Sequence, residues 1–419
     1  MAPPYLTRTI DRELDELMPL APAIALDGPK GVGKTGTARR RATQTWLLDL
    51  AEQRALLEAD PGLSGARQAG TLLFDEWQRM PAVWDRVRRA VDDGAPPGRF
   101  LLTGSASPAA GVTTHSGAGR ILSLRMRPMA LHERGITTPT VSLVDLVQGR
   151  SQRITGECAL TLPDYVQAIT ASGLPGITAG PPRLRTAALD AYLLRIVDRE
   201  LPEQGLAVRR PETLRRWLAA YAAATSTTTN YSAILDATTA GDGSQPSKVT
   251  TIAWRDHLTR LWLLDPVPGW SHSRNVFTHL QQAPKHQLAD PALAARLLNL
   301  GTHALMSARG ASMTGPLFEA LATLSVRVAA QAAGARVGHV RTKRGDREVD
   351  LVVEGDEGQV VGIEVKLSAT VDDADVRHLT WLRDRMPDEV VDLVVITTGR
   401  HAYRRRDGVA VVPLGLLGA

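Results

Sequence analysis

The eight residues from 28 to 35 constrain the fold of this chain more than any other segment does. They read Gly-Pro-Lys-Gly-Val-Gly-Lys-Thr and fit the pattern G-x-x-x-x-G-K-[ST], in which the backbone N–H groups of a loop wrap a phosphate. An apolar run at 23–26 precedes the loop and residues 36–50 follow it, which predicts a strand that leads through the loop into a helix N-terminus. We therefore expect an α/β domain that binds ATP or GTP through Gly28, Pro29, Lys30, Gly31, Val32, Gly33, Lys34 and Thr35.

Two side chains of this loop and a carboxylate pair further along the chain predict hydrolysis of the nucleotide. Lys34 can bridge the β- and γ-phosphates as a point charge, and the Thr35 hydroxyl can ligate the Mg²⁺ between them. The apolar run 71–74 ends in Asp75 and Glu76. Asp75 is expected to hold Mg²⁺ through water, and Glu76 to polarise the attacking water as general base.

A third segment, Thr103-Gly104-Ser105, follows the strand-like pair Leu101-Leu102. The hydroxyls of Thr103 and Ser105 suit a sensor of the γ-phosphate, which such a site needs between the first two motifs. The alternative is an ordinary turn rich in Ser, Thr and Gly. The residue types alone leave both interpretations open.

Together these segments resemble a group of bacterial and archaeal AAA-type ATPases. The resemblance is carried by the loop, by Asp75-Glu76-Trp77-Gln78, by Gly98-Arg99-Phe100 and by Leu102-Thr103-Gly104-Ser105. It implies that Thr103 and Ser105 sense the γ-phosphate, and that Arg120 acts in trans on the nucleotide of a neighbouring subunit in a homo-oligomer. The alternative for Arg120 is a solvated surface arginine, because the chain is rich in arginine.

The scarcity of lysine directs attention to the C-terminal part of the chain. The sequence has 49 Lys and Arg residues but only six lysines, so lysine remains where a guanidinium cannot easily replace an ammonium. Lys34 and Lys366 stand in recognisable groups of residues. The six are Lys30, Lys34, Lys248, Lys285, Lys343 and Lys366.

Asp350, Glu364 and Lys366 lie on two segments that predict a β-hairpin. The β-branched runs 347–353 and 360–366 flank a polar turn. Alternate residues of a strand share a face, so Glu364 and Lys366 point the same way and Asp350 can join them from the neighbouring strand. Two carboxylates that hold Mg²⁺ and a lysine that orients water are what metal-assisted phosphodiester hydrolysis requires.

This group resembles the D-x(n)-E-x-K core of the PD-(D/E)xK nuclease superfamily, which has a restriction-endonuclease-like fold. The resemblance implies Glu319 as a further metal ligand and an α-β-β-β-α-β order of elements. One alternative is that the Glu364-x-Lys366 pattern of an exposed edge strand serves only a cross-strand ion pair, and another is that a domain of this kind attached to an ATPase has lost cleavage. The elements expected are a helix that opens at Gly315-Pro316, a helix over 373–385 and a strand over 390–397.

Residues 136–300 are less informative, and their apolar spacing is largely helical. A short helix over 231–238, a helix that begins near Lys248 and a trailing β-like piece resemble a winged helix. Such a module either reads DNA or packs against protein. Its second helix presents Lys248 and Arg255 but few other base-reading side chains, so both interpretations stay open.

At 419 residues the chain exceeds one ordinary core, and we predict three domains, at 1–135, 136–300 and 301–419. A hydrophobic fraction of 43% with 22% charged residues is typical of a globular protein. The single cysteine, Cys158, excludes an intrachain disulfide and fits a reducing compartment. No apolar run approaches the ~20 residues of a membrane span, and the first residues lack a signal-peptide pattern, so we expect the cytoplasm.

The net charge of +5 permits an anionic partner, and clusters of basic residues favour DNA over a membrane as that partner. Each cluster alone is also compatible with a solvated face. An aromatic content of 4% weakens any case for stacking on single strands. The clusters are Arg209-Arg210, Arg215-Arg216, Lys343-Arg344 and Arg404-Arg405-Arg406.

The leading hypothesis is an ATP-binding and ATP-hydrolysing protein whose nucleotide state controls a DNA-directed, nuclease-like C-terminal domain. A second is a nucleotide-gated interaction module with an inert C-terminal domain, and a third is a transcription regulator that acts through the winged helix. The predicted cofactors are ATP and Mg²⁺. The predicted catalytic residues are Glu76, Lys34, Arg120 and Lys366, and the predicted metal ligands are Thr35, Asp75, Glu319, Asp350 and Glu364.

Overall fold

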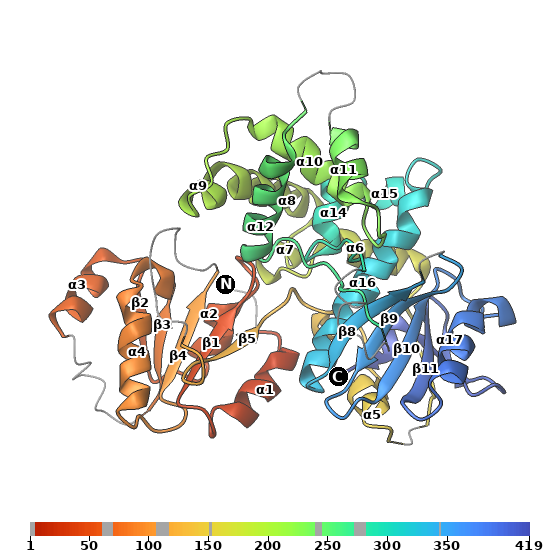
Figure 1. Cartoon of the computed structure of the whole chain (residues 1–419), viewed down its shortest axis with the longest axis horizontal. Helices are drawn as coiled ribbons and strands as arrows, with labels where there is room; N and C mark the ends of the chain where they lie inside the picture. The colour runs from red at the N-terminus through yellow and green to blue at the C-terminus, as the bar shows by residue number, and fades with distance from the viewer. Residues whose placement is uncertain are drawn as a thin grey trace. The chain divides into compact units, whose positions relative to one another are not determined.

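The computed structural model describes residues 5–60, 70–105, 117–150, 153–238, 245–271, 282–342 and 345–419. By its internal contacts the chain divides into two compact units, whose elements are labelled in Figure 1. The three-domain division stays a prediction from the sequence. Unit 1 comprises Met1–Arg127, Arg195–Arg209 and Ile252–Leu263, and unit 2 comprises Pro128–Leu194, Arg210–Thr251 and Leu264–Ala419.

Unit 1 contains a five-stranded sheet in the order β2-β3-β4-β1-β5, in which every pairing is parallel. The first strand therefore lies between two strands that come later in the chain. In open parallel sheets, ligands bind at the carboxyl ends of the strands beside such a change in strand order. The strands are β1 (Ala23–Asp27), β2 (Gln44–Leu47), β3 (Leu72–Asp75), β4 (Phe100–Gly104) and β5 (Leu122–Arg125).

The central strands β1, β3 and β4 are buried along nearly their whole length, as expected for a parallel sheet covered by helices. Phe74 of β3 and Leu102 of β4 are fully buried with Val83 and Val87, which lie one helical turn apart. This packing fixes the strand ends that carry the predicted motifs. The helices are α1 (Thr9–Leu17), α2 (Lys34–Arg39), α3 (Ala51–Ala59), η2 (Trp77–Arg79) and α4 (Ala82–Asp92), with η4 (Ile196–Glu200), α9 (Leu201–Glu203) and most of α12 (Lys248–Arg260) from later in the chain.

The helix after the phosphate-binding loop is shorter than the sequence predicts. The expectation of helix through residues 36–50 is wrong, because α2 ends at Arg39 and Gln44–Leu47 form strand β2. Thr45 and Trp46 favour strands, and Trp46 pairs with Phe74 on β3. Pairing with a distant segment therefore outweighs the local tendency to continue the helix.

Unit 2 contains a seven-stranded mixed sheet in the order β7-β12-β13-β11-β10-β9-β8. Strands β10, β11 and β13 run parallel, whereas β8, β9 and β10 form an antiparallel meander. A short second sheet pairs β14 (Leu417–Gly418) with β6 (Val141–Ser142). The strands of the larger sheet are β7 (Gly156–Glu157), β8 (Arg336–Arg341), β9 (Glu348–Glu354), β10 (Val360–Val365), β11 (Val390–Thr397), β12 (His401–Arg404) and β13 (Ala410–Pro413).

The predicted hairpin, helix and strand of the C-terminal region are present, the helix and the strand with the predicted bounds and the hairpin strands within one residue of them. Strands β9 and β10 pair antiparallel, and they are followed by helix α17 (Asp373–Arg385) and strand β11. Leu379 and Leu382 of α17 pack with Val360 and Leu393 of the sheet. With helix α16 (Ala311–Ala332) and β8 before the hairpin, the element order is the expected α-β-β-β-α-β.

The start of α16 differs from the prediction. The helix does not open at Gly315-Pro316 but begins at Ala311, so that Pro316 is inside it. Thr314 binds back to the carbonyl oxygen of Leu305 at 2.7 Å, which anchors the added first turn. Because proline lacks an N–H, the helix loses the hydrogen bond that residue 316 would otherwise donate. The carbonyl oxygen of Pro316 accepts a hydrogen bond from the Ser226 hydroxyl at 2.8 Å.

The remaining elements are mostly helices, as the apolar spacing predicts. The two helices of the predicted winged helix are present as α11 and α12, but its role stays a prediction. Among the described helices, none is both long and apolar enough to cross a membrane. The elements are η3 (Leu131–Arg134), α5 (Leu143–Val147), α6 (Leu162–Ala171), α7 (Pro175–Thr178), α8 (Pro182–Arg195), α10 (Pro211–Ala223), α11 (Tyr231–Thr238), α12 (Lys248–Arg260), α14 (Pro291–Leu297), α15 (Thr302–Leu305) and η5 (Leu414–Leu416).

Candidate functional site

The loop between β1 and α2 has a backbone that only glycine accommodates at its key positions. Gly28 has a φ of 153°, and a Cβ there would lie 2.1 Å from the carbonyl oxygen of Met126. Gly33, directly before α2, has a φ of 108°. Side chains would strain or clash at both positions, so the pattern of glycines follows from the loop's shape.

Lys34 lies inside this loop with its ammonium group turned toward backbone oxygens. Its Nζ donates to the carbonyl oxygens of Gly28 at 2.7 Å and Pro29 at 2.9 Å, and its side chain is buried. Burial lowers the pKa of Lys34 to about 8, although the negative charge of Glu76 partly offsets this effect. The lysine therefore carries a charge that neutral carbonyls stabilise only in part.

Three predicted residues meet at the carboxyl ends of β3 and β4. Asp75 and Thr103 are neighbours in the parallel register, and the Thr103 hydroxyl donates to Asp75 Oδ1. The Thr35 hydroxyl donates to the same oxygen at 2.7 Å. The sheet thus brings together residues from three motifs that are far apart in the sequence.

Glu76 has a backbone conformation that is unusual for its residue type. Its φ of 56° places it in the left-handed region directly after β3. Its carboxylate accepts a hydrogen bond from Gln78 Nε2 at 2.5 Å, and Gln78 lies 3.5 Å from the Ser105 hydroxyl. Burial raises the pKa of Glu76, and the charge of Lys34 offsets part of the rise. The strained turn and the raised pKa are both typical of a catalytic carboxylate.

The residues present fit a magnesium ion beside a bound nucleotide. Thr35 and Asp75 share a hydrogen bond, so a hydroxyl and a carboxylate oxygen already lie side by side. Oxygen ligands of this kind, completed by water and phosphate, are those that Mg²⁺ prefers. Asp75 and Thr35 would therefore hold the ion.

Arg8, which belongs to the region that resembles AAA-type ATPases, supports the loop through contacts that the sequence did not predict. It lies directly before α1, is 4% exposed, and donates from Nη1 to the Val32 carbonyl at 2.9 Å and from Nη2 to the Arg127 carbonyl at 2.7 Å. The guanidinium thus ties the loop to the segment after β5. A second cation of the loop, Lys30, pairs with Glu200 at 2.6 Å.

Arg120 lies on the surface of unit 1 rather than at the loop. Its Nε pairs with Asp92 Oδ1 at 2.8 Å, and Arg88 pairs with the other oxygen of Asp92 at 2.9 Å. The Arg120 side chain is 48% exposed, so a neighbouring subunit could contact it. Its predicted action in trans stays a prediction.

In unit 2, the predicted carboxylates and lysine do come together. Lys366 Nζ lies 2.9 Å from Glu364 Oε1, as expected for alternate residues of one strand. Asp350 accepts a hydrogen bond from the backbone N–H of Val365 at 2.9 Å through Oδ2. Glu319 faces the same group from α16. The hairpin and the helix therefore assemble the predicted set of side chains.

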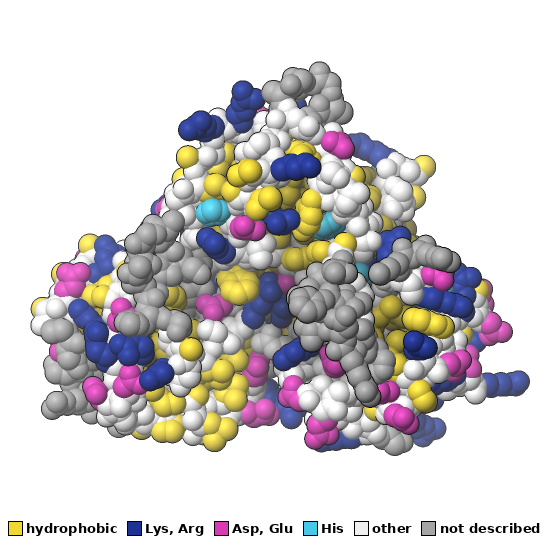
Figure 2. All heavy atoms as spheres, viewed as in Figure 1, with side chains coloured by type: hydrophobic (Ala, Val, Ile, Leu, Met, Phe, Trp, Pro, Cys, Tyr) yellow, Lys and Arg dark blue, Asp and Glu magenta, His cyan; other side chains and the backbone are white. Residues whose placement is uncertain are grey.

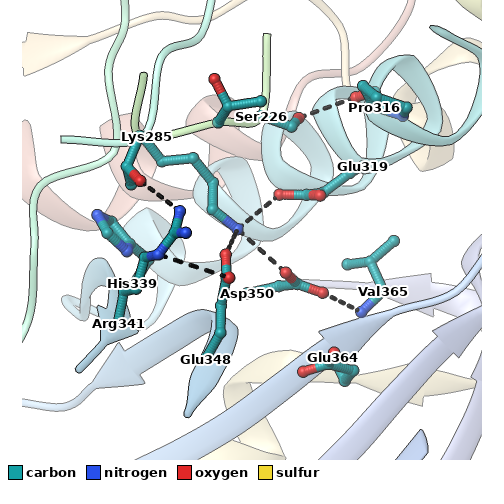
Figure 3. Close-up of polar contacts among 12 residues, drawn as sticks. Ser226, Lys285, Pro316, Glu319, His339, Arg341, Glu348, Asp350, Glu364 and Val365 are labelled. Atoms are coloured by element: carbon teal, nitrogen blue, oxygen red, sulfur yellow. Dashed lines mark hydrogen bonds and ion pairs between the residues drawn. The ribbon is translucent and has the colours of Figure 1, made fainter. Parts of the chain in front are cut away.

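A residue that the sequence analysis did not select, Lys285, lies in the middle of this set. Figure 3 shows its ammonium group reaching Glu319 of α16 and Asp350 of β9, at 2.8 and 3.0 Å. Glu348 lies 3.6 Å away. Burial alone would lower the pKa of Lys285, but Asp350 and Glu319 more than offset it, and the pKa is raised. The scarcity of lysine in this chain was the signal that could have identified it.

This arrangement does not fit a divalent metal ion at the predicted ligands. The Lys285 ammonium lies between Glu319 and Asp350, where a bound ion would have to be. Among the described residues, no three His, Cys, Asp or Glu side chains form a group that could hold a metal. Burial, followed by the charge of Asp350, raises the pKa of Glu319 and of Glu364 to about 8. The carboxylates are thus organised around an ammonium group.

Two arginines of the basic cluster 404–406, one of those that favoured DNA, are engaged in ion pairs. Arg404 pairs with Asp392 at 2.8 Å, and Arg405 pairs with Asp373 at 2.5 Å and Asp407 at 3.0 Å. Figure 2 shows Lys and Arg side chains interspersed with Asp and Glu over the visible face. The cluster at 343–344 lies outside the described residues. The charge that these arginines offer to a phosphate backbone is correspondingly reduced.

Comparisons with known proteins bear on each part of the chain. Residues 21–134 match the family of AAA domains, which supports an AAA-type ATPase domain with a P-loop α/β fold. Residues 162–304 and 314–417 each match a domain of unknown function, DUF8612 and DUF4143 respectively. These two matches do not support the nuclease-like or winged-helix interpretations, which stay predictions.

Among curated proteins, the chain is similar to two uncharacterized proteins, from Mycobacterium tuberculosis and Mycobacterium bovis. Each is 27% identical over 404 residues, with coverage of 94% of this chain and 80% of the relative. Among solved structures, it is similar to a Walker-type ATPase of Pyrococcus abyssi, with 14% identity, a TM-score of 0.37, and coverage of 70% of this chain and 96% of that one. A RuvB variant of Thermotoga maritima has 17% identity, a TM-score of 0.27, and coverage of 65% and 93%.

Proposed function

We propose that unit 1 binds ATP with Mg²⁺ and hydrolyses it. The observation that carries this proposal is the meeting of Thr35, Asp75 and Thr103 through hydrogen bonds at the ends of the central strands. The match to AAA domains supports ATP as the nucleotide. The Mg²⁺ ion, when bound, would neutralise the charge of the β- and γ-phosphates.

In this proposal each residue of the site has a defined role. Lys34 exchanges its bonds to the Gly28 and Pro29 carbonyls for phosphate oxygens, which are stronger partners for an ammonium. Glu76 takes a proton from the attacking water, and Gln78 orients its carboxylate. Thr103 and Ser105 sense the γ-phosphate.

The test is the rate of ATP turnover by purified protein. Glu76→Gln should lower kcat by about 10²- to 10⁴-fold while ATP binding is kept, because the general base is lost. Lys34→Ala should remove binding and turnover together. The matched controls are Glu52→Gln and Lys248→Ala, which change exposed residues of the same types. Turnover that survives both site variants would refute the proposal.

We propose further that the active form is a homo-oligomer in which Arg120 contacts the nucleotide of a neighbour. The exposure of Arg120 supports this role. Mixing Arg120→Ala with Glu76→Gln should restore part of the activity that each lacks alone, because an interface between the two variants combines the intact Glu76 of one subunit with the intact Arg120 of its neighbour. Arg88→Ala serves as control, since Arg88 pairs with the same Asp92. Lack of recovery in a mixed oligomer would rule out action in trans.

For unit 2 we propose that the nucleotide state controls binding of a partner, with DNA as the first class to test. The Lys285 ammonium among the carboxylates favours an inert, nucleotide-gated interaction module over a nuclease. Supercoiled and linear DNA should therefore stay intact with Mg²⁺ or Mn²⁺, with and without ATP. Cleavage by the wild type that is lost in Lys366→Ala would instead establish a nuclease.

DNA binding itself is tested separately from cleavage. If α12 contacts DNA, Lys248→Ala together with Arg255→Ala should weaken binding and reduce its salt dependence. Unchanged DNA binding would leave protein contact as the role of this helix. A difference in DNA binding or DNA cleavage between samples with and without ATP would support control by the nucleotide.

A further inference from the structure

The backbone around Lys285 is held in a fixed place within unit 2. Its N–H donates to the Val267 carbonyl at 2.9 Å, and its carbonyl accepts from the Val267 N–H at 2.9 Å. The next residue, His286, donates its N–H to the Thr227 carbonyl at 2.8 Å and accepts from the Ser226 N–H at 2.8 Å. The position of this lysine is therefore built into the fold and does not depend on side-chain contacts alone.

The ammonium group of Lys285 is sealed from water and surrounded by acidic oxygens. Lys285 is 0% exposed, and its three N–H donors face Glu319, Asp350 and Glu348. These carboxylates come from helix α16 and strand β9. The Lys285 ammonium thus holds carboxylates of two separate elements together, as a bound metal ion would.

A fourth carboxylate is left incompletely satisfied next to this group. Glu364 is 7% exposed, and its Oε1 accepts from Lys366 at 2.9 Å. Its Oε2 is buried and has no hydrogen-bond partner among the described residues. A buried carboxylate oxygen without a donor is costly, and it is the kind of atom that a cation would satisfy.

We propose that the Lys285 ammonium stands in for a divalent cation beside Glu319, Asp350 and Glu364, so that these carboxylates take no divalent metal ion while residue 285 is charged. The ammonium donates to carboxylate oxygens at 2.8–3.0 Å. Mg²⁺ needs oxygens at about 2.0–2.1 Å and cannot share the space with a second cation. The wild-type site is thus closed to metal, and its cation is covalently part of the chain.

The test is Mn²⁺ binding to the full-length protein without nucleotide, measured from the loss of the free-ion signal in electron paramagnetic resonance. Wild type should show only the background binding that Asp350→Asn also shows. Lys285→Met, which keeps the length of the side chain without its charge, should bind one further ion. Lys285→Met combined with Asp350→Asn should lose that ion again.

Thermal unfolding provides a second readout that does not depend on any activity. Mn²⁺ should raise the Tm of Lys285→Met but not of wild type. Lys366→Met is the matched control, because it removes a lysine at the same cluster and leaves the Lys285 ammonium in place. Lys285→Gln replaces Lys285→Met if the latter folds poorly, and folding that requires Mn²⁺ would support the proposal.

Three results would overturn the proposal. The first is Mn²⁺ binding by the wild type that is lost in Asp350→Asn. The second is folded Lys285→Met or Lys285→Gln that binds no more Mn²⁺ than wild type. The third is failure of both variants to fold with and without Mn²⁺, because a replaceable cation should be restored by the ion.

Discussion

Two buried lysines, one in each unit, show opposite responses to similar burial. Lys34 donates to the carbonyls of Gly28 and Pro29, and its pKa falls to about 8. Lys285 donates to Glu319 and Asp350, and its pKa is raised. Burial disfavours both ammonium groups, so the difference lies in whether the partners carry a full negative charge.

The comparison distinguishes a cation that is available to a ligand from one that is not. Lys34 is paired with neutral groups, and a phosphate would improve its environment. Lys285 already has carboxylates at hydrogen-bond distance, so an anionic ligand would have to displace them. A buried lysine that is already paired with carboxylates is therefore not evidence of an active site.

The largest expected effect comes from removing the two charges in the same way. Lys285→Met should lower the free energy of unfolding by about 3–5 kcal/mol, because it leaves buried carboxylates without their cation. Lys34→Met should leave stability unchanged or raise it, since the folded state already disfavours that charge. The measurement is the denaturant midpoint of unfolding without nucleotide, monitored by one probe in each unit.

Equal losses of stability in the two variants would break the comparison. The pair is well matched because both substitutions keep an unbranched side chain of similar length in a buried place. A probe in each unit is needed because the chain divides into two compact units and need not unfold in one step.

A smaller effect is expected at Arg8, which supports the loop without touching the nucleotide. Arg8→Lys keeps the charge but cannot reach the carbonyls of both Val32 and Arg127, because lysine lacks the planar fork. ATP affinity should fall by roughly tenfold, consistent with one lost buried hydrogen bond. Arg12→Lys is the control, since Arg12 lies on α1, the helix that Arg8 precedes, and pairs with Glu16 at the surface. Unchanged affinity would show that the loop keeps its shape without this support.

The sequence predicted best where local pattern and final structure agree. Strands β9 and β10, helix α17 and strand β11 were located correctly because runs of β-branched residues and an apolar helical spacing are properties of neighbouring residues. The meeting of Thr35 with Asp75 also followed, because the motifs fix which strand ends carry them. Patterns with a known chemistry thus predicted which side chains meet at the strand ends of unit 1, whereas their roles stay predictions.

Prediction from the sequence was wrong or incomplete where contacts between distant segments determine the structure. Helix α2 is cut short because Gln44–Leu47 pairs with β3, a contact that no local pattern shows. Lys285 reaches Glu319 and Asp350 because its backbone pairs with Val267, and these partners lie 34 and 65 residues away in the chain. No motif contains Lys285, so only the fold could place its charge among the predicted metal ligands.

The smallest effect is a pH dependence that separates the two lysines. The pKa of Lys34 in the free protein is about 8, so its ammonium loses its proton as the pH rises through this value. If ATP binds the charged form, the apparent affinity falls with the charged fraction, about twofold at pH 8 and tenfold at pH 9. Isothermal titration from pH 7 to pH 9 measures this decline.

Glu76 and Lys285 are expected to respond differently from Lys34 when the pH is changed. The raised pKa of Glu76 means that the base form is lost as the pH falls, so kcat should decline from a pH above the ordinary carboxyl value of about 4.3. The raised pKa of Lys285 keeps its ammonium charged throughout this range, while the ammonium of Lys34 loses its proton. An ATP affinity that stays constant from pH 7 to pH 9 would mean that bound phosphate holds the proton on Lys34, and the contrast between the two lysines would then exist only in the free protein.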